Sequence, residues 1–303
     1  MSGVTSPASS SSSFAKPFAA AAGPFASPHA TQNYLFSRPR EGIKLIIGTV
    51  VACVLLSGAV FAAGRGEHAM GQWERQTTLF VFVAQLASLL QDLTWQRMST
   101  ASDVLWISRT IFTVKVLAAL TNLAIYVDGR HFVVDAITGR PNCMLRWVEW
   151  TVLSYTMTYV VEGVDATESR TPHYAAASQA LSTLCGSLLP FVSHMPLLWL
   201  TLLCVSFVLF AYIFYRLAHK ERRLLELRGQ PCANLSGASG YAVHRAEMSV
   251  TLYRQCAGTW TSLVLVWVTD AASRLLLPHR CDPTYPDWGF IADCAVDFIA
   301  KSL

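Results

Sequence analysis

Apolar residues gather in eight long blocks along the chain, separated by short polar segments. A block of about 20 residues is enough for a helix to cross a hydrocarbon core of ~30 Å. The blocks cover residues 43–64, 74–96, 104–127, 145–164, 174–193, 196–218, 248–270 and 285–303. The last block is short and the chain ends inside it, so we expect its helix to be truncated. The pattern predicts an all-α membrane protein.

Composition agrees with a membrane protein and excludes several other classes. Hydrophobic residues make up 53% of the 303 residues and charged residues only 14%, which is too apolar for an ordinary soluble domain. The net charge of +4 is spread over loops without a basic groove, so nucleic acid is not an expected partner. The eight cysteines show no paired spacing typical of a metal site. Cys143 and Cys281 fall in two loops on the same outer side, and a disulfide between them is an open alternative to two free thiols.

Basic loops predict the orientation in the membrane. Residues 1–42 form a Ser/Ala/Pro-rich segment, which we interpret as a disordered tail, with a targeting peptide as the alternative. The segments "SRPREGIK" (37–44) and "YRLAHKERRLLELR" (215–228) are rich in Lys and Arg and should both be cytoplasmic. We therefore expect a cytoplasmic N-terminus, location in the plasma membrane, and a sixth helix that continues to about Arg228. A Gly/Ser-rich break, residues 229–240, should follow it.

Charged residues inside the last block share one helical face. In "DWGFIADCAVDFIAKSL" the spacing of Asp293, Asp297 and Lys301 is four residues, which aligns them along one side of a helix. Ionisable groups within a membrane are costly and mark functional sites by default. Lys301 is either a lysine that snorkels to the interface or a buried cation paired with acids.

The fourth block begins with a second charged pair. In "RWVEWTVLSYTMTYVV" Arg146 and Glu149 alternate with Trp147 and Trp150. Taken alone, this stretch is typical of an interfacial aromatic belt with a snorkelling arginine. If Glu149 lies deeper it needs a cation from another helix, and Lys301 is the obvious candidate.

These two motifs together resemble those of microbial (type 1) rhodopsins. The matching stretches are Arg146-Trp147-Val148-Glu149-Trp150 on one helix and Asp297-Phe298-Ile299-Ala300-Lys301 on the last. The resemblance implies that Lys301 binds all-trans-retinal as a covalent Schiff base and that Glu149 and Asp297 are its counterions, with Arg146 beside them. It also implies that Trp150 packs against the polyene.

A tryptophan on the seventh block is the third element of the resemblance. Trp267 lies 34 residues before Lys301 (301 − 267), where the family places a tryptophan against the retinal ring. Trp260, one heptad earlier, is the rival for this role. The resemblance covers residues 73–303 and implies a seven-helix retinal-binding bundle. The additional helix at 43–64 and a cytoplasmic N-terminus are similar to the layout of enzyme-linked rhodopsins.

Departures from the family pattern bear on the kind of rhodopsin. Val160 stands eleven residues after Glu149, where outward proton pumps commonly carry a carboxylate, and Glu162 follows two residues later. Ser154 stands where channelrhodopsins often carry cysteine. Lys115 resembles a residue of the second helix of channelrhodopsin, but the glutamates that line that helix are missing, since Phe112, Ala119 and Leu123 occupy their places.

The resemblance therefore implies a light-sensing photoreceptor that signals to a cytoplasmic domain after residue 303. A light-gated ion channel or light-driven pump is the alternative, and a membrane protein without retinal is a third. No catalytic domain is expected within these residues, so the chain itself is not predicted to be an enzyme. Its expected contacts are lipid and retinal. Formation of a homo-oligomer and the role of Asp270 remain open.

Overall fold

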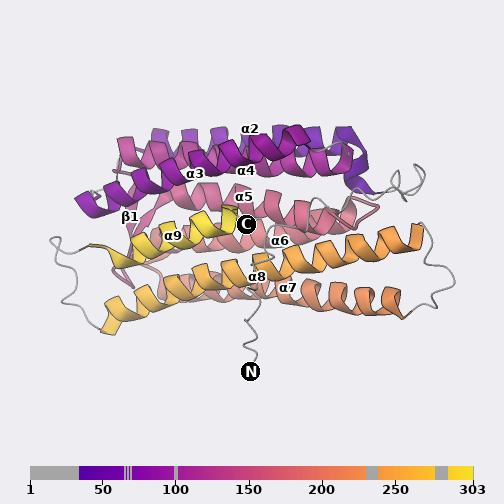
Figure 1. Ribbon diagram of the computed structural model, residues 1–303. Helices are drawn as coiled ribbons and strands as arrows, with labels where there is room; N and C mark the ends of the chain where they lie inside the picture. Colours follow the sequence, from indigo (N-terminus) through magenta and orange to yellow (C-terminus); the bar gives the residue numbers. More distant parts are fainter. Residues whose placement is uncertain are drawn as a thin grey trace, which may run out of the picture.

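The computed structural model describes residues 34–64, 66, 68, 70–98, 102–229, 238–276 and 286–302. Their helices lie side by side with nearly parallel axes (Figure 1). The helices are α2 (Pro39–Ala63), α3 (Gln72–Met98), α4 (Ser102–Val127), α5 (Met144–Gly163), α6 (Arg170–Leu188), α7 (Pro196–Arg228), α8 (Ala238–Leu276) and α9 (Trp288–Ser302), with the short 3-10 helices η2 (Leu35–Ser37) and η3 (Leu189–Val192).

Helices α3 to α9 form a closed ring in which each packs against its neighbours in sequence and α9 returns to α3. Helix α2 lies outside this ring and packs against α4 and α5. The Thr49 hydroxyl on α2 lies 2.7 Å from the Thr156 hydroxyl on α5, which joins the outer helix to the ring. In the described part of the chain, α2 thus lies beside the ring that the other helices form.

Five of the described helical segments are long and apolar enough to cross a membrane. They are Pro39–Ala63, Gln72–Thr94, Leu105–Val127, Arg170–Val192 and Pro196–Arg228. Large apolar side chains on their outer faces are exposed, such as Leu55, Leu197 and Val208, because lipid rather than protein is their expected surrounding. The protein is therefore an integral multi-pass membrane protein. A total of eight crossings remains a prediction.

Several boundaries differ from those expected. Helix α2 begins at Pro39 and is preceded by η2, so residues 34–42, assigned to the tail, are part of the fold. Helix α7 ends at Arg228 as predicted, whereas α8 begins at Ala238, inside the predicted Gly/Ser break. Helix α9 has 15 residues, and its ribbon ends part-way along the bundle (Figure 1).

A short antiparallel hairpin adds two strands that the all-α prediction omitted. Strand β1 (Phe132–Val134) pairs with β2 (Pro141–Cys143), and β2 leads directly into α5. The Asp135 carboxylate accepts two turn N–H groups and the indole N–H of Trp199 on α7 at 2.8 Å. Gly139 completes the turn with φ 68°, a conformation that favours glycine. The hairpin thus fixes the start of α5 at one end of the bundle.

The opposite end of the bundle is closed by the segment before α2. Leu35 and Phe36 are buried in an apolar cluster that includes Tyr159 and Val164 of the α5 end. The Leu35 N–H donates to the Ala166 carbonyl at 2.8 Å. This contact joins η2 to the connection between α5 and α6.

Arg245 on α8 completes this end of the bundle. Its guanidinium lies 4.8 Å from the ring centroid of Tyr34 and donates to the Val164 carbonyl at 3.0 Å. Burial lowers the pKa of Arg245 to about 10, so the group still carries its charge at neutral pH. The segment before α2, the end of α5 and the start of α8 therefore meet around one cation.

Candidate functional site

Lys301 is a buried cation held between two carboxylates. The residue is 5% exposed, and its Nζ contacts Glu149 Oε1 and lies 2.5 Å from Asp297 Oδ1. Glu149 comes from α5, while Asp297 lies one turn before Lys301 on α9. Because a buried charge is tolerated only when it is paired and hydrogen-bonded, the two acids account for the position of the amine. Lys301 does not snorkel to the surface.

Arg146 contributes a second cation to the same cluster. Its Nη1 lies 2.8 Å from Asp297 Oδ2 and 4.0 Å from Glu149 Oε2. The Trp150 indole N–H donates to Asp297 Oδ1 at 2.7 Å. The cluster thus contains two cations and two anions, and Asp297 has more partners than Glu149. Arg146 is 3% exposed, so it belongs to the buried site and not to an interfacial belt.

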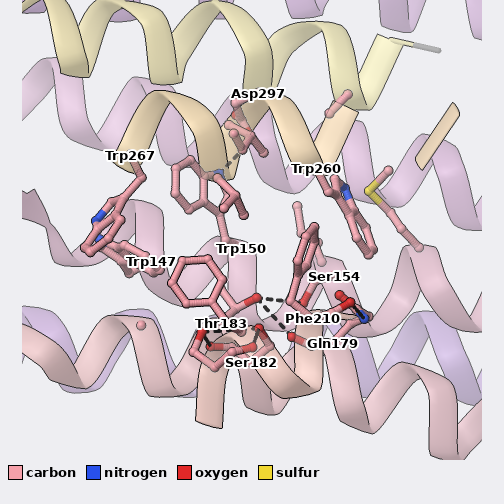
Figure 2. Close-up of a pocket in the computed structure, with 18 of the residues that line it drawn as sticks. Trp147, Trp150, Ser154, Gln179, Ser182, Thr183, Phe210, Trp260, Trp267 and Asp297 are labelled. Carbon is pink, nitrogen blue, oxygen red and sulfur yellow. Dashed lines mark hydrogen bonds between the residues drawn. The ribbon is translucent and has the colours of Figure 1, made fainter. Parts of the chain in front are cut away.

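A mainly apolar cavity of about 140 Å³ begins beside Lys301 and runs between α5, α6, α7, α8 and α9. Its walls carry the four tryptophans Trp147, Trp150, Trp260 and Trp267 and the aromatic ring of Phe210 (Figure 2). Polar side chains gather on the side away from Asp297. They are Ser154, Gln179, Ser182 and Thr183.

Ser154 has its own hydrogen bond within α5. Its hydroxyl donates to the Thr151 carbonyl at 3.1 Å and lies 3.4 Å from the Thr183 hydroxyl of α6. It therefore lines the cavity without contacting the charged cluster. Met157 and Leu153, on the same helix, extend the apolar wall around it.

Both candidate tryptophans on α8 line the cavity, at different places. Trp260 belongs to the apolar cluster that includes Ala300, the residue before Lys301. Trp267 lies two turns further along α8, with its ring centroid 6.0 Å from the guanidinium carbon of Arg140 near the hairpin. In Figure 2 the two rings stand at opposite ends of the cavity, with Trp150 between them. Trp260, the rival in the sequence, thus belongs to the same apolar cluster as the residue next to the lysine.

Two polar residues that no sequence motif marks, Asn122 and Gln85, lie behind Arg146. Asn122 of α4 is fully buried, and its Oδ1 accepts a hydrogen bond from Arg146 Nη2 at 2.8 Å. Asn122 in turn donates to Gln85 Oε1 of α3 at 3.1 Å. A usable signal was the seven-residue spacing of Lys115 and Asn122, which places both on one face of an apolar helix.

Lys115 is paired on the same side of the bundle. Its Nζ lies 2.8 Å from Asp92 Oδ2 and donates to the Ser88 hydroxyl at 3.0 Å, both on α3. Lys115 of α4 thus forms an ion pair with an acid of the neighbouring helix α3.

Asp293 and Asp270 belong to a separate network near the hairpin. Asp293 pairs with Arg140 Nη2, and Asp270 Oδ2 lies 2.8 Å from Arg140 Nε. Arg274, one turn after Asp270 on α8, also pairs with it at 3.0 Å. Asp293 therefore shares a helical face with Asp297 and Lys301 but has a different partner, and Asp270 ties α8 to the hairpin. The alternative of a Cys143–Cys281 disulfide involves Cys281, which lies outside the described residues.

Glu162 is engaged at the opposite end of α5. Its carboxylate accepts two hydrogen bonds from Arg216 at 2.6 and 3.0 Å and one from the Tyr253 hydroxyl at 2.8 Å. Lys220 Nζ lies 3.1 Å from the second oxygen. Val160 is buried in an apolar cluster. Position 160 thus offers no carboxylate, and the nearest acid is held by two cations.

The fold and the buried charges define a helical multi-pass membrane protein with a lysine at the end of an aromatic cavity. The chain is similar to the crystal structure of the transmembrane domain of Salpingoeca rosetta rhodopsin phosphodiesterase, with a TM-score of 0.61 and 17% sequence identity over 86% of this chain and 92% of that chain. A crystal structure of the transmembrane domain and linker region of that protein gives 0.62 and 16%, over 87% and 80%.

No protein-family model matches the chain, and no curated protein sequence matches it significantly. At these identities, the two structural neighbours establish the fold. The chain has the fold of the transmembrane domain of an enzyme rhodopsin, which confirms at the level of fold the resemblance found in the sequence.

Proposed function

We propose that this protein is a light-sensing membrane photoreceptor that binds retinal covalently at Lys301. The observation that carries the proposal is the buried Lys301 amine, which lies between Glu149 and Asp297 at one end of an aromatic cavity. In its neutral form this amine could condense with an aldehyde in the cavity to an imine, with loss of one water, and the two carboxylates would stabilise the positive charge of the imine once it is protonated. Retinal would supply absorption of visible light and a change of shape on illumination.

The residues around the cavity fit a long apolar ligand. Trp150, Trp260 and Trp267 offer flat apolar faces along its length, and Ser154 is a small polar group within the wall. Aromatic side chains contribute large contact areas in such sites. Glu149 and Asp297 would be the counterions, and Arg146 would balance their second negative charge.

The first experiment is expression with all-trans-retinal followed by an absorption spectrum. The unchanged protein should show a visible band, and Lys301→Ala should remove it, because the covalent attachment point is lost. Lys115→Met is the matched control, since Lys115 is also a buried lysine with an acidic partner but lies away from the cavity; it should keep the band. A visible band that survives in Lys301→Ala would refute the assignment.

We propose that the protein resides in the plasma membrane with its N-terminus in the cytoplasm. The signal would then leave through the cytoplasmic ends of α7 and α8, which are the end of α7 and the start of α8. Helix α8 runs without interruption from the two cavity tryptophans to Arg245, so a change at the cavity can move its far end. By analogy with the rhodopsin phosphodiesterase whose transmembrane domain has the same fold, the output would be a cytoplasmic signalling domain after residue 303. Light-dependent accessibility of cysteines placed at residues 226 and 244, on a background without the native exposed thiols, would test the movement.

A second candidate function is light-driven or light-gated ion transport. The observation that favours it is the buried polar chain from Arg146 through Asn122 to Gln85, together with the Lys115–Asp92 pair between the same helices. Polar groups of this kind line ion pathways in membrane proteins. Photocurrent recording separates this candidate from the sensory one.

A further inference from the structure

Asn122 occupies a central position that the proposed chromophore chemistry does not yet explain. It is fully buried on α4 and lies between Gln85 of α3 and Arg146 of α5. A buried amide in an apolar helix is costly unless its donors and acceptor are satisfied. The hydrogen-bond partners of Asn122 therefore indicate its structural role.

The hydrogen bonds fix which side of the amide faces Arg146. Both Nδ2 hydrogens are used, one for the Ala118 carbonyl at 2.9 Å and one for Gln85 Oε1 at 3.1 Å. The remaining atom, Oδ1, accepts from Arg146 Nη2 at 2.8 Å. A flipped amide would present N–H groups to a guanidinium, which has only donors, so the opposite orientation is excluded.

The hydrogen bond between Asn122 Oδ1 and Arg146 Nη2, which we call the clamp, determines which acid Arg146 neutralises. With Nη2 held by Asn122 at 2.8 Å and by the more distant Cys294 Sγ at 3.3 Å, Nη1 lies 2.8 Å from Asp297 and 4.0 Å from Glu149. Asp297 thereby shares its charge among Arg146, the Trp150 indole and Lys301, while Glu149 faces Lys301 with its Oε1. The asymmetry between the two acids depends on where the guanidinium is held.

Arg146 has room to move if the clamp is removed. Its Nε has no hydrogen-bond partner within the described residues. A small cavity of about 10 Å³, near the size that one water requires, borders Arg146 and extends to Arg140 and Asp293. Without the acceptor on Asn122, the guanidinium could turn toward this space and away from Asp297.

We propose that Asn122 is a positioning residue that holds Arg146 against Asp297 and thereby makes Glu149 the principal counterion of the cation on Lys301. The inference rests on the proposed retinal attachment and adds the reason why two similar acids differ. Gln85 supports the role by accepting one of the two N–H groups that orient the amide.

The test is a double-mutant cycle on the absorption maximum. Glu149→Gln alone should shift the band strongly, because Asp297 is already neutralised by Arg146. In the Asn122→Leu background the shift caused by Glu149→Gln should fall to half or less, since the freed Asp297 takes over as counterion. Thr110→Val is the control, because Thr110 is a fully buried α4 residue whose hydroxyl, among the described residues, bonds only to the Trp106 carbonyl of its own helix; it should leave the shift unchanged. Equal shifts in both backgrounds would overturn the proposal.

A second measurement uses the retinal-free protein. Asn122→Leu should lower its midpoint of thermal unfolding, and at least half of that loss should disappear in the Arg146→Gln background, because the lost contact no longer exists there. Additive losses would overturn the clamp. If Asn122→Leu does not fold, Gln85→Leu replaces it in both cycles. A smaller spectral shift on Glu149→Gln in that background would support the proposal, and an unchanged shift would contradict it. Absence of any pigment in the unchanged protein would instead refute the proposed function, and the retinal-free cycle would still decide on the clamp.

Discussion

Replacement of Glu162 by alanine should destabilise the bundle more than the loss of any exposed ion pair on the same helices. Glu162 is 1% exposed and ties three helices together at one end of the molecule. Its carboxylate binds Arg216 through two hydrogen bonds, Lys220 at 3.1 Å and the Tyr253 hydroxyl at 2.8 Å. The change to alanine leaves both cations and the hydroxyl without this acceptor.

The expected loss in the free energy of unfolding depends on which partners Arg216 and Lys220 keep. Removal of one member of a buried ion pair costs about 3–5 kcal/mol, because the other charge stays buried and unpaired. Lys220 keeps Asp165 at 2.6 Å, so the cost falls mainly on Arg216 and the lower end of the range applies. A loss of about 3 kcal/mol corresponds to a factor of roughly 150 in the ratio of folded to unfolded protein.

Equilibrium unfolding in mixed micelles, followed by tryptophan fluorescence, measures this loss. Glu221→Ala is the matched control, because Glu221 pairs with Arg254 between α7 and α8 at 2.7 Å but is exposed, with 37% and 65% of the two side chains accessible. Exposed pairs contribute at most about 1 kcal/mol. Equal losses for Glu162→Ala and Glu221→Ala would refute the reasoning that burial makes Glu162 important.

Three further outcomes are expected. Glu149→Gln should make the pigment lose its visible band at a lower pH than the unchanged protein, with any remaining protonated form absorbing at longer wavelength; a spectral titration that matches the unchanged protein would contradict its role as counterion. Lys115→Met should lower the free energy of unfolding by about 2–3 kcal/mol, and the additional change Asp92→Leu should restore most of it, because an apolar pair replaces a lone buried acid; no recovery in the double variant would count against the ion pair. Trp260→Leu should shift the absorption maximum more than Trp267→Leu, since Trp260 belongs to the same apolar cluster as Ala300; the reverse order would assign the contact with the retinal ring to Trp267.

The helices and the central charges were predictable because their signals are local. A helix that crosses a membrane needs a long apolar run, and that requirement is visible in any window of the sequence. Arg146, Glu149 and Lys301 could be singled out because charges within such runs are rare and costly. Their burial in one cluster agrees with the pairing that the sequence suggested.

The partners that cross between distant segments were not predictable in the same way. Arg140 lies in a hairpin loop, and nothing near it in the sequence indicates that it pairs with Asp293, 153 residues later. Two strands of three residues each carry too little periodicity to be distinguished from a loop. Asn122 escaped notice because a single amide is less conspicuous than a charge, although its spacing from Lys115 marked the same helical face.

Steady photocurrent is the outcome that separates sensing from transport, and we expect little of it. A pump of the kind that the sequence resembles needs a carboxylate near Val160 to reprotonate the Schiff base, but that position is apolar and buried. Glu162, the nearest acid, is held by Arg216 and Lys220 and is poorly placed to give up a proton. Lys115 is likewise paired with Asp92 of α3 and does not stand as a lone cation between these helices.

Whole-cell recording under continuous light tests this expectation directly. The protein should give at most a brief charge displacement at light onset, since an isomerising chromophore moves charge within a closed bundle, and the current should then return to baseline. Lys301→Ala is the control that defines the response without pigment. Disruption of the ion pairs of Glu162 by Glu162→Gln should leave the steady current near zero, because Val160 still offers no donor. A sustained, reversible photocurrent in the unchanged protein would overturn the sensory function and establish the polar chain through Asn122 as the first place to look for an ion path.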